Sequence, residues 1–195
     1  MNYPLNLRFK LMALSNQIFA TDANGQLICY VKQKMFKLKE HVNVFADEQQ
    51  QQLLCEIKAD KVIDWSAKYT FTAPDGSVIG SVKRQGMRSL FKAHYQIFDA
   101  TDNLVMEIKE ENPWTKFWDG LLGELPLIGI FSGYMLHPKY LVTNATGEPS
   151  FRLTKKPAFF EGLFQIDELK DVQEADDMRV LLSLLMMILL ERRRG

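Results

Sequence analysis

Residues suited to disulfide, metal or catalytic chemistry are scarce in this sequence. Of its 195 residues, only two are cysteine and three are histidine. Cys29 and Cys55 are too few for a disulfide framework, and they fit a reduced, cytoplasmic protein. The sequence also has no CxxC pair, no glycine-rich phosphate loop and no Ser-His-Asp order. We therefore expect neither enzymatic activity nor a cofactor.

Net charge is absent as well. Lysine plus arginine and aspartate plus glutamate number 24 each, so no overall electrostatic field draws the chain onto nucleic acid. The opening segment, residues 1–8, lacks a basic start followed by an apolar run, so we expect no signal peptide. We expect a cytoplasmic protein without a nucleic-acid partner.

The longest apolar run is too short to cross a bilayer. From Val180 to Leu190 every residue is apolar except Ser183. Such a helix rises roughly 17 Å, whereas a bilayer core is about 30 Å thick. Because a helix that is apolar on every side has to be surrounded, we expect a buried helix over about residues 176–192. A short membrane tail anchor is the alternative interpretation.

What the sequence does contain is a repeat of about 26 residues. Each copy has an apolar strand, a turn rich in Asp, Asn or Gly, and an alternating strand that ends in an apolar residue. Equivalent phenylalanines are 26, 26 and 27 residues apart, and the apolar residues that end the copies are 26, 25 and 26 apart. The first set is Phe19, Phe45, Phe71 and Phe98; the second is Val31, Ile57, Val82 and Ile108.

Each copy predicts a β-hairpin, because both arms alternate with period two and turn residues lie between them. A fifth copy ends at Leu153 after an insertion, and residues 164–166 open a sixth before the helix. The turn pairs are Asn24-Gly25, Asp75-Gly76, Asp102-Asn103 and Thr146-Gly147.

The hairpins together predict a closed barrel, since closure removes the exposed edges of an open sheet. The predicted fold is mainly β: a closed antiparallel barrel of about twelve strands, built from repeated hairpins and enclosing the C-terminal apolar helix. We expect one domain over residues 1–195, with an insertion at about residues 112–136.

Three segments carry a resemblance to a known family: Tyr69–Phe71 with Asp75-Gly76 and Val82-Lys83; Lys92–Asp99; and Tyr140–Gly147 through Lys155-Lys156 to Phe164–Ile166. In these the chain resembles the LURP-one-related family of the tubby C-terminal-like superfamily, which also includes phospholipid scramblases. The resemblance implies a twelve-stranded barrel around a central helix. Tubby domains bind phosphoinositides and scramblases act at phospholipid membranes, whereas many LURP-like proteins have no settled role. The chain lacks the proline-rich and cysteine-rich segments of scramblases.

Basic residues gather on predicted strands in two places. Such patches attract anionic lipid by on the order of 1 kcal/mol for each charge near the surface. Lysine is also common on strand exteriors, where it discourages edge pairing. The candidate lipid-binding residues are Lys32, Lys34, Lys37, Lys39, Lys83, Arg84 and Arg88.

The insertion contains Pro113–Pro126, whose apolar residues recur at helical spacing and predict a short amphipathic helix. Trp114, Phe117 and Trp118 suit a membrane interface. They equally suit a lid over one end of the barrel.

An acidic segment precedes the helix. Asp167, Glu168 and Asp171 are candidate calcium ligands, although the segment lacks the spacing and glycine of a calcium loop. The alternative is that these residues are solvated and that Asp176 and Asp177 cap the helix. His41 and His94 occupy equivalent repeat positions, so we expect a structural role for them.

These observations favour a non-catalytic domain that binds phospholipid or phosphoinositide peripherally at the inner membrane face. The alternatives are a protein-interaction scaffold without a lipid ligand and calcium-dependent phospholipid scrambling. The sequence names no protein partner.

Overall fold

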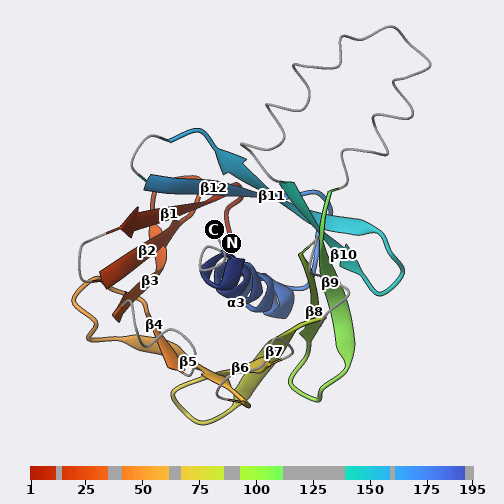
Figure 1. The fold of residues 1–195 in the computed structure, drawn as a ribbon, viewed down its shortest axis with the longest axis horizontal. Helices are drawn as coiled ribbons and strands as arrows, with labels where there is room; N and C mark the ends of the chain where they lie inside the picture. Colours follow the sequence, from red (N-terminus) through yellow and green to blue (C-terminus); the bar gives the residue numbers. More distant parts are fainter. Residues whose placement is uncertain are drawn as a thin grey trace, which may run out of the picture.

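Twelve antiparallel strands close into a barrel around one helix (Figure 1). The structure is a computed structural model, and it describes residues 1–11, 15–34, 41–61, 67–85, 93–111, 139–158 and 161–191. The strands are β1 (Leu5–Leu11), β2 (Ser15–Thr21), β3 (Leu27–Lys34), β4 (His41–Phe45), β5 (Leu53–Ala59), β6 (Lys68–Thr72), β7 (Val78–Arg84), β8 (His94–Phe98), β9 (Leu104–Glu110), β10 (Lys139–Asn144), β11 (Pro149–Lys156) and β12 (Glu161–Glu168). The helix is α3 (Glu174–Glu191).

Every strand pairs with its neighbours in the chain, and β1 pairs with β12 to close the ring. The predicted barrel of about twelve strands and its central helix are thus confirmed. The five complete repeats are the hairpins β2–β3, β4–β5, β6–β7, β8–β9 and β10–β11, and the sixth copy is β12. The helix begins at Glu174, two residues before its predicted start, so Asp176 and Asp177 lie in its first turn.

A β-bulge recurs at the same place in all five hairpins. In each case the second strand has one extra residue that has no partner on the first strand. A bulge of this kind bends its strand and increases the local twist, which helps a sheet curve into a barrel. The extra residues are Ile28, Leu54, Ile79, Val105 and Ser150.

The predicted turn pairs lie in the hairpin loops. Gly25, Gly76 and Gly147 have φ between 79° and 86°, and Asp102 has φ 70°, a left-handed conformation that Gly adopts readily and Asp tolerates. In most loops an Asp or Asn side chain accepts hydrogen bonds from the backbone N–H groups two and four residues later, and Asp22 and Asp99 are examples.

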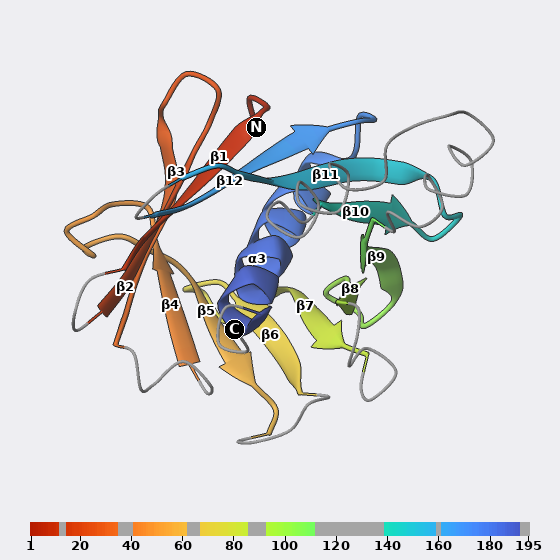
Figure 2. The same cartoon turned by 45° about the horizontal axis from the view of Figure 1, so that its top comes forward.

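The two ends of the barrel contain different parts of the hairpins (Figure 2). Loops within hairpins lie at one end, which we call the turn end, and α3 begins there. The first and last residues of each hairpin lie at the opposite end, which we call the connection end. Glu191, at the end of α3, accepts a hydrogen bond there from the Tyr95 hydroxyl at 2.6 Å.

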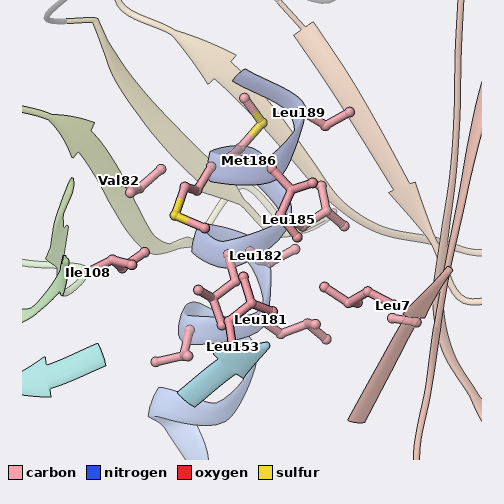
Figure 3. Close-up of a cluster of buried hydrophobic side chains, with 14 of the residues drawn as sticks. Leu7, Val82, Ile108, Leu153, Leu181, Leu182, Leu185, Met186 and Leu189 are labelled. Carbon is pink, nitrogen blue, oxygen red and sulfur yellow. The ribbon is translucent and has the colours of Figure 1, made fainter. Parts of the chain in front are cut away.

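The helix fills the barrel. Every residue from Val180 to Leu189 is at most 4% exposed. Figure 3 shows Val82 and Ile108 on one side of the helix and Leu7 on the other. The one polar residue in this stretch, Ser183, donates its hydroxyl to the carbonyl oxygen of Arg179 at 2.8 Å, so its burial leaves no unpaired hydroxyl.

The burial confirms the interpretation of this segment as a buried helix. Each large apolar side chain removed from water stabilises the fold by roughly 1.5–3 kcal/mol. Within the ranges that the structure describes, no helix combines the length and apolar character needed to span a bilayer.

Candidate functional site

Outward side chains of five neighbouring strands form one cross-strand row. Register pairs place Lys156 of β11 beside Leu163 of β12, Leu163 beside Arg8 of β1, and Arg8 beside Phe19 of β2. Phe19 in turn pairs with Tyr30 of β3, and the two rings lie 5.0 Å apart. Neighbours in such a row are in side-chain contact distance. The row therefore combines cations with an apolar surface.

A second row lies two residues further along each strand, toward the connection end. In it Lys10 of β1 pairs with Gln17 of β2, and Gln17 pairs with Lys32 of β3. Arg8 and Lys32 are exposed, whereas Lys10 and Lys156 are half-buried. We call the surface formed by Arg8, Lys10, Lys32 and Lys156 the basic face.

A pocket of about 400 Å³ lies within this surface. Its lining includes three cations of the basic face, the carboxylate of Glu48 and the apolar side chains Phe19 and Leu163. The Lys10 ammonium lies 5.0 Å from the centre of the Phe19 ring, within the range of a cation–π contact. The full lining is Asn6, Leu7, Arg8, Lys10, Phe19, Thr21, Glu48, Lys156, Leu163 and Phe164.

Negative charge gathers at the turn end. The loops within the five hairpins (22–26, 46–52, 73–77, 99–103 and 144–148) carry seven acidic residues and no lysine or arginine. Hydrogen bonds from backbone N–H groups keep the pKa of Asp22 and Asp47 below its ordinary value. These loops therefore remain negatively charged at neutral pH.

The predicted lipid-binding residues are separated by the fold. Lys32 and Lys34 belong to β3, and Lys83 is exposed on β7, on a different side of the barrel (Figure 1). Arg84 points into the barrel, where its Nη2 lies 3.5 Å from Glu191 Oε1, so it is no part of an external patch. Six predicted residues lie outside the described ranges: Lys37, Lys39, Arg88, Trp114, Phe117 and Trp118.

Of the four residues of the basic face, only Lys32 was predicted from the sequence. Arg8 and Lys10 precede the repeats, and Lys156 ends the fifth copy. The usable signal was the alternation of Leu5–Lys10, which predicts a strand with Arg8 and Lys10 on one face. Only the pairing of the first strand with the last brings them next to Lys156.

The candidate calcium ligands lie among polar and acidic neighbours. Asp167 accepts a hydrogen bond from the Gln165 amide. Burial raises the pKa of Glu168, and the nearby Asp177 and Asp171 raise it further. Asp177 is itself buried and accepts a hydrogen bond from the Tyr3 hydroxyl at 2.9 Å. Among the described residues, no group of three or more His, Cys, Asp or Glu side chains is arranged to hold a metal ion.

His41 and His94, which occupy equivalent positions in the repeat, also have equivalent neighbours in the structure. The Nε2 atoms of His41 and His94 lie 3.6 Å and 3.4 Å from the carboxylates of Glu56 and Glu107, in equivalent hairpins. Both cysteines are free and buried, and burial raises the pKa of each thiol to about 12. They act as small core residues.

Known proteins resemble this chain in sequence and in fold. Residues 27–121, which run from β3 past β9, match the family model described as LURP-one-related. The X-ray structure of an Arabidopsis thaliana protein is similar with a TM-score of 0.50 and 12% identity, over 98% of this chain and 92% of that one. At that identity the likeness concerns the fold alone. No curated protein matches the sequence. Residues 27–121 therefore match the LURP-one-related family, in agreement with the resemblance that the sequence segments carry.

Proposed function

We propose that this domain is a non-catalytic module that associates peripherally with anionic phospholipid at the inner face of the membrane. The observation that carries the proposal is the basic face, four cations on neighbouring strands with acidic hairpin loops at the turn end. The separation gives a neutral protein a positive side and a negative end. An anionic surface attracts the first and repels the second.

The expected strength is modest. Each lysine or arginine near an anionic membrane contributes about 1 kcal/mol, so the basic face supplies on the order of 4 kcal/mol. This corresponds to dissociation constants of about 1 mM. Because the attraction is lost within a Debye length of about 8–10 Å at physiological salt, binding is reversible and falls as salt rises.

Vesicle co-sedimentation tests the proposal. The protein is mixed with vesicles of phosphatidylcholine alone and with phosphatidylserine added, at low and at high salt. We expect enrichment on the anionic vesicles only, and a loss of enrichment at high salt. Equal behaviour with both vesicles at low salt would contradict the proposal.

Charge reversal locates the surface. Lys10→Glu with Lys32→Glu should abolish the enrichment. Lys58→Gln is the control, because Lys58 is exposed, as Lys32 is, but lies on β5 and already pairs with Glu56. A reduction by Lys58→Gln as large as by the double variant would place the contact elsewhere on the barrel.

Two further measurements address the alternatives. Calcium that creates lipid transfer between leaflets of a reconstituted vesicle would favour scrambling. A stoichiometric protein partner that survives reversal of Lys10 and Lys32, together with no vesicle binding, would favour a scaffold.

A further inference from the structure

We infer that the pocket on the outer face of β12, β1 and β2 is a discrete site for a phosphate ester with hydroxyl groups, such as a glycerophosphate head group. The inference deepens the proposed lipid association and rests on it for the source of the ligand. It goes further because a diffuse basic surface needs no pocket.

Three cations surround the pocket at spacings set by the sheet. Arg8 and Lys156 flank Leu163 in one row, so their backbones are two strand spacings, or roughly 10 Å, apart. Lys10 lies two residues beyond Arg8 on the same face of β1, roughly 7 Å away. A phosphate between them meets positive charge from three sides.

Arginine and lysine have different parts in such a site. A guanidinium offers two parallel N–H donors to two phosphate oxygens, whereas an ammonium acts as a point charge. Arg8 lies at the centre of the row and is exposed, whereas Lys156 lies two strands away in the same row and Lys10 lies two residues further along β1. We therefore assign the oriented contact with phosphate to Arg8 and charge neutralisation to the two lysines.

The apolar part of the lining argues against a bare anion. Leu163 and Phe19 are the immediate row neighbours of Arg8, and the Phe19 ring is backed by Tyr30. This surface gains nothing from inorganic phosphate, but it buries the carbon atoms of an ester. A volume of about 400 Å³ falls in the usual range of small-molecule sites.

The polar remainder of the lining suits hydroxyl groups. The Glu48 carboxylate repels a second anionic group but accepts hydrogen bonds from a hydroxyl. The Asn6 amide and the Thr21 hydroxyl both donate and accept. With three cations and one carboxylate, the pocket matches one phosphate on a hydroxylated carrier.

The direct test measures soluble ligands. Glycerol 3-phosphate, inorganic phosphate and glycerol are titrated into the protein, and the backbone amide resonances of β1, β2 and β12 are followed by NMR. We expect saturable shifts with glycerol 3-phosphate, weaker shifts with phosphate and none with glycerol. Equal affinity for phosphate and its ester would overturn the assignment of an ester site.

Two variants divide the pocket. Arg8→Gln should weaken glycerol 3-phosphate binding roughly tenfold, as loss of a bidentate charged contact does. Phe19→Ala should weaken the ester but leave inorganic phosphate unchanged. If Arg8→Gln fails to fold, Lys156→Gln removes a charge of the pocket from a different strand and should also weaken binding. Lys58→Gln is the control and should bind normally. Normal ester binding by Lys156→Gln and by a folded Arg8→Gln would overturn the inference.

Vesicles distinguish this inference from the proposed function. Phosphatidylglycerol and phosphatidylserine vesicles of equal charge are compared, and we expect a preference for phosphatidylglycerol that Arg8→Gln removes. Binding to both without preference, equally reduced by any single charge removal on the basic face, would sink the pocket and leave the proposed function standing. Glycerol 3-phosphate binding without vesicle binding would do the reverse and make the pocket a site for soluble esters.

Discussion

Arg179 donates a hydrogen bond of 3.1 Å from its Nε to the carbonyl oxygen of Ile79, which joins α3 directly to β7. Ile79 is the extra residue of the β7 bulge, so the irregular backbone of the strand has a partner in the helix. Gly80 lies beside this contact, and a Cβ atom there would be 2.5 Å from the carbonyl oxygen of Phe98 and 2.8 Å from Arg179 Nε. The helix reaches β7 because residue 80 has no side chain.

Gly80→Ala should therefore destabilise the domain. The backbone carbonyl of Phe98 cannot rotate away as a flexible side chain would, so we expect a loss of at least about 3 kcal/mol, the upper end for an overpacked core. Urea unfolding followed by circular dichroism measures it. Gly76→Ala is the control: its φ is also positive, but nothing lies within 4 Å of the added Cβ. It should cost only about 1–2 kcal/mol, and equal losses would contradict the steric argument.

Leu185→Ala tests the helix as the core of the barrel. Leu185 is 0% exposed, so the variant leaves a cavity and should lower the free energy of unfolding by about 2–5 kcal/mol. Leu169→Ala changes the same side chain where it is 43% exposed and should change stability by less than about 0.5 kcal/mol. Similar effects at the two sites would show that α3 is not packed as described.

Tyr95→Phe removes the hydroxyl that donates to Glu191 at the end of the helix. A hydrogen bond to a charged group contributes about 1.5–3 kcal/mol, and Tyr95 is fully buried, so we expect a loss in that range. Tyr30→Phe is the matched control, because among the described residues the Tyr30 hydroxyl has no hydrogen-bond partner. The control should change the urea midpoint little; a neutral Tyr95→Phe would mean that solvent replaces the bond.

Asp99→Asn should reduce the acid sensitivity of folding. Hydrogen bonds, first from the Asn103 backbone, lower the pKa of Asp99 from an ordinary value of 3.8 to about 2. A depressed pKa contributes stability that is complete above pH 3.8 and is lost as the pH falls through about 2. Urea unfolding between pH 5 and pH 2, values chosen to bracket that window, should show a smaller decline for the variant than for the original protein.

Asn144 supplies the reciprocal experiment. It accepts the same backbone bonds, from residues 146 and 148, that Asp99 accepts from residues 101 and 103. An amide therefore holds this loop without titrating, and Asp99→Asn should remain folded at neutral pH. Asn144→Asp should add acid sensitivity in the same window. An unchanged pH profile would show that protonation of a carboxylate in this loop position does not affect the stability of the fold.

The two thiols should be unreactive in the folded protein. Burial raises the pKa of Cys29 and Cys55 to about 12, so almost no thiolate exists at neutral pH and reagents cannot reach the sulfur atoms. Iodoacetamide labelling followed by mass spectrometry should modify both cysteines in guanidinium chloride and neither in buffer. Rapid labelling of either one in buffer would reveal an opening of the barrel near β3 or β5.

The barrel was predictable because its evidence is local and repeated. Alternation, turn pairs such as Asp75-Gly76, and spacings of about 26 residues all lie within single hairpins, and each copy supports the others. The recurring bulge was not predictable in the same way. An extra residue such as Leu54 looks like any other strand residue, and only the pairing partner shows that it is unmatched.

The site was predicted less well, for a physical reason. Charge along the chain indicated Lys32 and Lys83, but a surface is made by residues from different strands. Arg84 shows the difficulty: it follows Lys83, and the period-two alternation of β7 turns it inward to Glu191. Arg8 and Lys156 are 148 residues apart in the sequence and meet only across β12.

The order of the elements has a consequence for synthesis on the ribosome. The helix that fills the interior is translated after all twelve strands, and β1 has no closing partner until β12 has been made. A nascent chain with every strand completed still has nothing for its apolar inward faces to pack against. Domains whose contacts are this distant in sequence fold slowly and expose aggregation-prone strands meanwhile. The barrel therefore completes its core only once α3 has been made.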